Sequence, residues 1–290
     1  MKKDEVLRLV DECGLTRVKA QIEGHILPAI RVETQPIAED RMPVGASKIG
    51  GCPDLPEGVA WPAWNGVPLS FLAQVRLEDV AALDAEHVLP ESGLLLFFYD
   101  PYQEAWGFDP KDKGRSRVLY AAAAEPLRRA AVPPVMVDGG RFNPCSVGFS
   151  SILTIPDSGS RQAVAMKLKY TSPDDPAEQG QYFNLHERMK EAQKAASGHW
   201  LLGHPDPVQN EMQLECQLVT NGIYCGDATR DPRSKDLEEG ADDWRLLFQV
   251  DTDDNAAMMW GDLGKVYFWI RRQDLAARAF DRTWAILQCG

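Results

Sequence analysis

The fold is decided by the stretch Phe71-Leu-Ala-Gln74-Val75, which is followed by Gly93-Leu-Leu-Leu-Phe97-Phe98-Tyr99. The pattern returns near the C-terminus as Leu247-Phe-Gln249-Val250 and then Gly264-Lys-Val-Tyr-Phe268-Trp269-Ile270. Each copy is a strand pattern that ends in Gln-Val, an acidic segment, and an aromatic strand pattern that begins at glycine. This repetition favours two similar, duplicated β-rich units, and a chance match between apolar strands is the alternative.

The rest of the chain adds strands and peripheral helices to these two units. Further strands are predicted over 118–122, 151–155 and 283–288, and helices within 3–24 and over 176–197 and 273–278. Short turns rather than crossover helices join the strands, so we expect an α+β fold with mostly antiparallel sheets. One compact body is expected, made of an N-terminal helical segment (1–35), a first β-rich unit (36–160), a helical connector (161–199) and a second β-rich unit (200–290).

The composition is that of an ordinary globular chain with a strong acidic bias. Its 290 residues are 44% hydrophobic and 26% charged, with a formal net charge of −12. A negative field repels phosphate backbones and anionic lipid headgroups, so neither nucleic acid nor a membrane is an expected partner. The six cysteines contain no Cys-x-x-Cys pair, which is typical of free thiols in a reducing compartment. Since Asp4 and Glu5 interrupt the apolar core that a signal peptide needs, we expect a cytoplasmic location.

Several motifs in series resemble those of one bacterial protein family. The first are Ser47-Lys-Ile-Gly-Gly-Cys-Pro53 with Trp61-Pro62, the strand 71–75, and Leu89-Pro-Glu-Ser-Gly-Leu94 with Phe97-Phe-Tyr-Asp100. The later ones are Leu202-Gly-His-Pro-Asp-Pro-Val-Gln209, Trp244-Arg-Leu-Leu-Phe-Gln-Val-Asp251, Met259-Trp-Gly-Asp262 and Trp284-Ala-Ile-Leu-Gln-Cys289. Their order over residues 40–290 is similar to that of the YwqG-like bacterial proteins. The resemblance implies an α+β fold rich in sheet, and because that family is a domain of unknown function it implies no substrate, cofactor or catalytic residue.

One acidic loop has the spacing of a calcium site. Asp251, Asp253, Asn255 and Asp262 occupy positions 1, 3, 5 and 12 of a twelve-residue segment, as the oxygen ligands of an EF-hand loop do. Position 6 is Ala256, where the sharp turn requires glycine, and position 12 is Asp where a longer Glu would reach the metal. A solvated acidic hairpin is therefore the favoured interpretation, and no cofactor is expected.

Three histidines are also candidates for a metal site. His199 and His204 flank a short apolar run, and His186 lies on the preceding predicted helix. A spacing of five across a helix end and a loop does not bring two imidazoles to one face, unlike the i, i+4 arrangement of zinc-binding helices. Individually hydrogen-bonded histidines are the favoured interpretation.

Candidate ligand-binding residues occur in loops and at strand ends. The segment 47–51 offers a hydroxyl, a cation and two glycine amides to an anion, and ordinary turn glycines are the alternative. Tryptophans in loops often line pockets, and packing between sheets is the favoured alternative for them. We expect the loops 47–51 and 259–262 to lie near each other, so that opposite charges orient a ligand. The full set of candidates is Ser47, Lys48, Gly50, Gly51, Trp61, Gln74, His204, Gln209, Trp260 and Asp262.

Two functional hypotheses follow from these features. Gly-x-Ser-x-Gly, dinucleotide and kinase motifs are missing from the sequence, so it carries no signature of a common enzyme class. The leading hypothesis is a non-catalytic cytoplasmic binding protein whose partner is a basic protein or a small ligand. The alternative is a hydrolase-like small-molecule enzyme with its site at the seam between the two repeated halves. Paired carboxylates near His204 in a closed pocket would favour the enzyme.

Overall fold

The computed structural model describes residues 1–169, 177–194, 198–226 and 231–290. In this part of the chain, helices accompany one large sheet with the strand order β14-β13-β12-β11-β1-β10-β2-β6-β7-β8. All neighbouring strands in it are antiparallel, which confirms the predicted α+β class and strand pairing. The strands are β1 (Leu27–Pro36), β2 (Lys48–Ile49), β6 (Ser70–Arg76), β7 (Leu94–Tyr99), β8 (Ser116–Ala121), β10 (Cys145–Thr154), β11 (Trp200–Leu201), β12 (Trp244–Asp251), β13 (Lys265–Arg271) and β14 (Trp284–Gln288).

Smaller elements surround this sheet. Two short strand pairs are β3 (Asp54–Pro56) with β9 (Leu127–Arg129), and β4 (Ala63–Trp64) with β5 (Val67–Pro68). The helices are α1 (Lys3–Glu12), α2 (Lys19–Gly24), α3 (Leu77–Val80), α4 (Arg161–Ala165), α5 (Glu178–Ala192), α6 (Gln213–Thr220), α7 (Ser234–Leu237) and α8 (Arg272–Ala276). No helix in the described ranges is long and apolar enough to cross a membrane.

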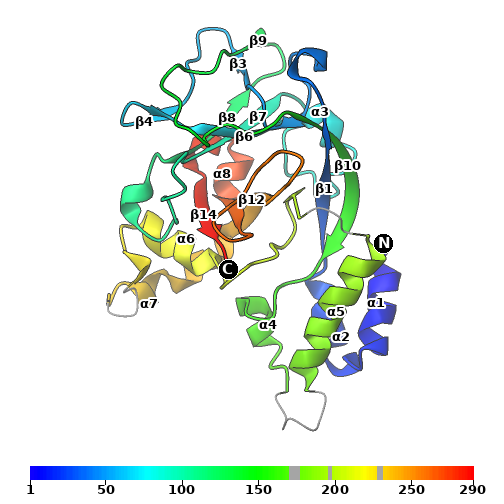
Figure 1. The fold of residues 1–290 in the computed structure, drawn as a ribbon. Coiled ribbons are helices and arrows are strands. Elements are labelled where there is room, and N and C mark those ends of the chain that lie inside the picture. The colour runs from blue at the N-terminus through cyan, green and yellow to red at the C-terminus, as the bar shows by residue number, and fades with distance from the viewer. Residues whose placement is uncertain (170–176, 195–197, 227–230) are drawn as a thin grey trace.

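The centre of the large sheet is the pair formed by β1 and β10. Both strands are ten residues long, and they pair without a register shift from Leu27 opposite Thr154 to Pro36 opposite Cys145. Figure 1 shows them side by side as the two longest arrows. On its other edge β1 pairs with β11, and β10 pairs with β2. The sheet therefore divides at this pair, with β11 to β14 on one side and β2, β6, β7 and β8 on the other.

The sheet curls until its outer parts meet. The ring of Phe97 in β7 lies 4.8 Å from that of Phe248 in β12 and 5.2 Å from that of Phe268 in β13, measured between ring centroids. Beyond β7, the indole N–H of Trp284 in β14 donates to the carbonyl of Gly107 at 2.8 Å. Both outer parts thus share one apolar core, as expected when strands far apart in sheet order are rich in aromatic residues.

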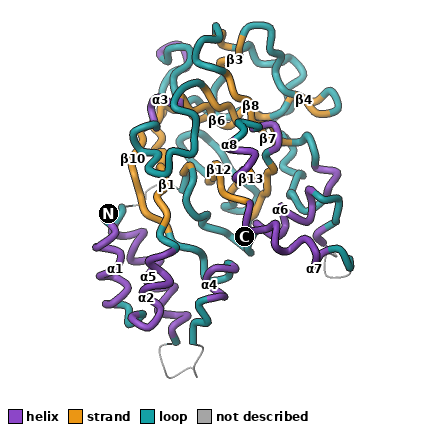
Figure 2. Tube along the Cα trace, turned by 180° about the vertical axis from the view of Figure 1, so that it is seen from behind, coloured by secondary structure: helices purple, strands orange, loops and turns teal. Residues whose placement is uncertain are grey.

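The N-terminal helices form a separate cluster with α5. Val6 and Val10 of α1 belong to the same buried apolar group as Tyr182 and Leu185 of α5. Figures 1 and 2 show α1, α2 and α5 together at one end of the molecule, beyond the end of the β1–β10 pair. The helix predicted over 176–197 is confirmed as α5, while residues 176 and 195–197 lie outside the described residues.

Candidate functional site

The segment 47–51 is part of the interior. The hydroxyl of Ser47 donates to Asp79 at 2.7 Å and accepts from the backbone N–H of Arg76 at 2.8 Å. Lys48 is fully buried, and its ammonium lies 3.3 Å from Glu39 and 3.4 Å from Asp54. Both side chains therefore hold the protein together, and neither faces solvent.

The two glycines of this segment are required by close packing. Gly50 and Gly51 have φ of +67° and +71°, and an added Cβ would lie 2.1 Å from the carbonyl oxygen of Asn143 or the carboxylate of Glu39. Their amides donate to the carbonyl oxygens of Leu72 and Phe142. The N–H groups that the sequence offers to an anion are thus already used within the protein.

Gln74 is the centre of a buried clamp. Its side-chain oxygen accepts from the backbone N–H of Asp54 at 2.8 Å, and its side-chain nitrogen donates to Ala46 and to the carboxylate of Asp54. The guanidinium of Arg129 donates to the same carboxylate at 2.9 Å. Burial raises the pKa of Asp54, but Arg129, the Gly45 amide and Lys48 outweigh it and hold that pKa below its ordinary value.

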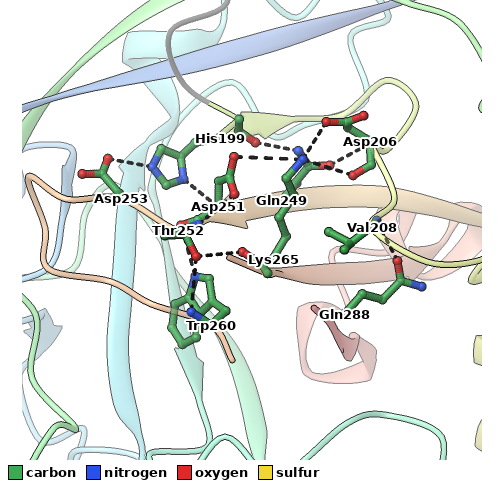
Figure 3. A network of polar contacts seen from close by, with 12 residues as sticks. His199, Asp206, Val208, Gln249, Asp251, Thr252, Asp253, Trp260, Lys265 and Gln288 are labelled. Atoms are coloured by element: carbon green, nitrogen blue, oxygen red, sulfur yellow. Dashed lines mark hydrogen bonds and ion pairs between the residues drawn. The ribbon is translucent and has the colours of Figure 1, made fainter. Parts of the chain in front are cut away.

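Gln249 makes a second clamp of the same kind, which Figure 3 shows. Its side-chain oxygen accepts from the backbone N–H of Asp206 at 2.9 Å, and its nitrogen donates to the carbonyl of Gly198 at 2.6 Å. The ammonium of Lys265 lies 2.6 Å from the Asp206 carboxylate and 4.0 Å from that of Asp251. The network fixes the loop that carries His204 and Gln209 onto the sheet.

His199 and Trp260 have structural contacts in the same network. The Nδ1 atom of His199 accepts from the backbone N–H of Asp251 at 2.9 Å, so the ring carries its proton on Nε2 and donates to Asp253, also at 2.9 Å. Trp260 is fully buried, and its indole N–H donates to the carbonyl of Asp251 at 3.1 Å. Trp260 is therefore a packing residue, as favoured for the tryptophans generally, and it does not line an exposed pocket.

The acidic loop after β12 is a closed turn. Asp253 and Met258 form a bridge, and the carboxylate of Asp253 accepts from Thr34 as well as from His199. Asn255 also donates to Thr34, while Asp262 is exposed and its carbonyl accepts from the backbone N–H of Gly290. In the described part of the chain, no group of three or more His, Cys, Asp or Glu side chains is arranged to hold a metal ion.

The remaining predicted residues lie apart from one another. The indole N–H of Trp61 donates to the carbonyl of Leu69, and Gln209 donates to the carbonyl of Cys289. The imidazole Nε2 of His204 is 2.8 Å from the carbonyl of His25, and burial lowers its pKa to about 4. His204 shares a small cavity with His186, whose Nε2 is 3.0 Å from the carbonyl of Pro156.

The two loops predicted to meet do approach each other through one residue. The amide of Gly51 donates to the carbonyl of Phe142 at 3.0 Å, and the ring of Phe142 lies 5.3 Å from that of Trp260. Since Phe142 and Trp260 are buried there, the contact is an apolar junction. Lys48 and Trp260 are both fully buried, so these two loops do not form the exposed ligand-orienting surface expected between Lys48 and Asp262.

A cleft of about 430 Å³ lies elsewhere, and we name it the arginine cleft. One wall is the turn 87–90 that follows α3, the other is α8 with Arg278 just beyond its end, and Arg245 of β12 also lines it. In the described residues, its lining contains no Asp or Glu. The lining residues are His87, Val88, Leu89, Pro90, Arg245, Arg272, Leu275, Ala276 and Arg278.

Three guanidinium groups give this cleft its charge. Arg272 and Arg278 are exposed, and neither side chain has a hydrogen bond or ion pair with another described residue. Arg245 is 9% exposed and donates to Glu86 at 2.6 Å, but its buried Nε has no partner within the described ranges. A buried donor of this kind is rare in folded proteins and marks a position for a ligand or an ordered water.

The backbone at the cleft is held in an unusual conformation. His87 and Arg278 have φ of +52° and +56°, a region that residues other than glycine seldom adopt. The turn before the cleft is fixed by Asp84, whose carboxylate accepts from the backbone N–H of Leu89 at 2.8 Å. Strained residues held by their surroundings are frequent at binding sites, so the cleft is both preformed and charged.

A larger groove of about 670 Å³ also has a charged lining, with both arginines and carboxylates. Arg282 donates to Asp274 at 2.9 Å, and Arg271 stacks over Trp244 at 4.9 Å while donating to Gln217. Asp281 also lines it. Lys113 and Arg117 line the groove as well, and Asp274 and Asp281 offset part of this positive charge, whereas the described lining of the arginine cleft contains no carboxylate.

Sequence reasoning did not identify the arginine cleft. Arg245 lies in β12, Arg272 in α8 and Arg278 just after α8, and their spacing follows no known motif. The one available signal was that Arg245 lies directly before the apolar run Leu246-Leu-Phe248 of a strand, where a charged residue needs a partner or a function.

The fold is that of an α+β protein, and its cationic cleft is lined by residues from both β-rich regions of the chain. A family model described as a domain of unknown function, DUF1963, matches residues 47–289, so the chain belongs to that family. The matched range includes all residues that line the cleft. No curated protein matches the chain.

Proposed function

We propose that the protein is a non-catalytic cytoplasmic ligand-binding protein of the YwqG-like type, and that it binds a small organic anion in the arginine cleft. The observation that carries the proposal is that Arg245, Arg272 and Arg278 line one cleft, and that the buried Nε of Arg245 has no partner among the described residues. Guanidinium groups bind carboxylate and phosphate through parallel N–H donors, so three of them around one hollow match an anionic head group.

The rest of the cleft supports an organic ligand rather than a bare ion. Val88, Leu89, Pro90 and Leu275 supply apolar surface beside the arginines. A volume of about 430 Å³ is in the range of small-molecule sites. The net charge of −12 repels polyanions at long range, which favours a small anion over nucleic acid. The alternative of a basic protein partner has no comparable feature in its support.

An enzyme remains the second candidate because of one residue. His87 lines the same cleft, and its imidazole has no hydrogen-bond or ion-pair partner in the described part of the chain. A histidine beside a bound anion can act as a general acid or general base, which fits the hydrolase-like alternative. The enzyme would be favoured over simple binding if the wild type releases phenol from phenyl phosphate and His87→Gln does not.

We propose further that residues 36–160 and 200–290 are duplicated units, which makes the cleft a seam between repeats. The strand orders β2-β6-β7-β8 and β11-β12-β13-β14 run outward from the β1–β10 pair in the same sequence. The β6–β7 and β12–β13 pairs each have a register shift at one leucine, which is Leu72 in the first pair and Leu247 in the second. The carbonyl of Leu72 accepts from the backbone N–H of Gly50, and the carbonyl of Leu247 accepts from the backbone N–H of Leu202.

The two clamps give the duplication its most specific support. The segments Gly51-Cys-Pro-Asp54 and Gly203-His-Pro-Asp206 share the pattern Gly-x-Pro-Asp, and both follow a residue with positive φ. In each unit the strand glutamine accepts from the backbone N–H of that aspartate. Gln74→Ala and Gln249→Ala should therefore destabilise the protein equally, each by about 2–4 kcal/mol. A large effect at only one site would count against two equivalent units.

Binding of a matched ligand series tests the proposed function. Phenyl phosphate should bind saturably, more tightly than inorganic phosphate, and benzyl alcohol should not bind. The double variant Arg272→Gln and Arg278→Gln should weaken phenyl phosphate binding by about tenfold or more, because two charge-assisted contacts are lost. Arg41→Gln removes an exposed arginine outside the cleft and should leave binding unchanged. Equal losses in both proteins would indicate a nonspecific charge effect and would refute the site.

A further inference from the structure

A further pocket, of about 300 Å³, lies between the loop that follows β7, the strand β14, and α6 with the segment just after it. Three aromatic residues line it, and two of them are unusually exposed, Trp106 at 36% and Tyr224 at 47%. Phe108 packs edge-on against Tyr224 with ring centroids 5.6 Å apart, and its carbonyl accepts from the backbone N–H of Cys225. The aromatic walls are therefore fixed in place before any ligand arrives.

A carboxyl group lies among these rings. Glu215 of α6 lines the pocket, and its carboxylate has no hydrogen bond or ion pair with any other described residue. In the described residues, no Lys, Arg or His lines the pocket. Burial raises the pKa of Glu215 to about 7, because it disfavours the charged carboxylate and no group in the described residues offsets this effect.

We infer that this pocket is a binding site for a small organic ammonium ion. A cation is attracted to aromatic ring faces and to an unpaired carboxylate, and the pocket combines both. The apolar part of such a ligand would pack on Trp106 and Tyr224, while its ammonium would meet Glu215. The amide groups of Gln209 and Gln288 are already bonded to backbone groups at the rim, so they leave the charge of Glu215 for the ligand.

Binding should be coupled to ionisation of Glu215. An ammonium ligand stabilises the carboxylate, so affinity should rise by about tenfold or more between pH 5.5 and pH 8. The other titratable groups that line the pocket are Cys225 and Tyr224. Burial raises the pKa of the Cys225 thiol to about 12, so that thiol remains protonated over this range.

Calorimetric titration with n-butylammonium tests the inference on the full chain. The wild type should bind it saturably at pH 8, and should bind its neutral analogue n-butanol at least tenfold more weakly. Glu215→Gln keeps the shape of the side chain and should reduce n-butylammonium affinity by about tenfold, as should Trp106→Leu. The arginine-cleft double variant should bind it as the wild type does, which separates this site from the proposed function.

Any of three results would overturn the inference. The first is equal affinity for n-butylammonium and n-butanol, because the carboxylate would then play no part. The second is unchanged n-butylammonium affinity in Glu215→Gln when the circular dichroism of this variant matches that of the wild type. The third is an absence of saturable binding by the wild type at pH 8.

Discussion

Arg245 donates to Glu86 at 2.6 Å and joins β12 to the turn after α3. The pair connects residues from the two β-rich regions of the chain, and it holds the guanidinium at the arginine cleft. Glu86 occupies one terminal nitrogen, and the buried Nε is left without a partner in the described residues. An arginine oriented in this way by one carboxylate is arranged to donate to a second anion.

Glu86→Gln should tighten anion binding. The substitution keeps an oxygen that accepts from Arg245 but removes a negative charge close to the cleft. Repulsion between that charge and a bound anion falls, so phenyl phosphate affinity should rise roughly two- to fivefold at low salt. Asp262→Asn removes an exposed charge in another loop and serves as the control. Weaker binding by Glu86→Gln alone would mean that the ion pair itself, rather than the free donors, defines the site.

Lys48→Met should strongly destabilise the fold. Lys48 is fully buried beside Glu39 and Asp54, and its loss leaves buried carboxylate charge less compensated. The free energy of unfolding should fall by about 3 kcal/mol in urea denaturation. The exposed Lys111, changed to Met, should alter it by less than about 0.5 kcal/mol. Equal effects of the two substitutions would contradict a structural role for Lys48.

Glu215 should make the protein less stable at alkaline pH. Its pKa is raised by burial from 4.5 to about 7, so the folded state binds the proton more tightly than the unfolded state does. Stability is therefore lost as pH rises from about 4.5 through 7. Glu215→Gln should stabilise the protein on the order of 2 kcal/mol at pH 8 and have little effect at pH 4.5. Thermal unfolding at both pH values measures this, and a gain of equal size at both would refute the assignment.

His204 should have the opposite effect at acidic pH. Burial lowers its pKa from 6.5 to about 4, despite the hydrogen bond to the carbonyl of His25. The unfolded state then binds a proton that the folded state does not, so stability is lost as pH falls from 6.5 toward 4. His204→Gln should flatten the stability profile in that window, with His87→Gln as an exposed control. Profiles of the same slope for His204→Gln and the wild type would argue against this role.

Much of the fold was predictable from local patterns. The runs 71–75, 93–99, 247–250 and 264–270 formed strands where expected, since alternating or continuous apolar residues bounded by glycine favour sheet. The curl that brings Phe97 against Phe248 was not predictable, because it depends on packing between strands far apart in the sequence. The same limitation applies to the candidate site.

Polar residues in the motifs suggested ligand binding, but most of them bind other parts of the protein. Lys48 and Gln74 look like surface groups in a loop and a strand end, yet both are fully buried. Gln74 donates to Asp54 across 20 residues of sequence, and Arg129 donates to Asp54 across 75, distances that no short motif spans. Gly50 and Gly51 are likewise required by close packing and do not form an anion-binding loop. Charge and glycine patterns thus identified important residues but not what those residues contact.

The most direct test of the central proposal is the NMR signal of the Arg245 Nε–H group, assigned by its loss in Arg245→Lys. On titration with phenyl phosphate, this resonance should move downfield and saturate together with the binding isotherm, because a new hydrogen bond to an anion forms at that donor. The Nε–H signal of Arg41 should not move. If the Arg245 signal stays in place while phenyl phosphate saturates the protein, the anion binds elsewhere and the arginine cleft is not the functional site.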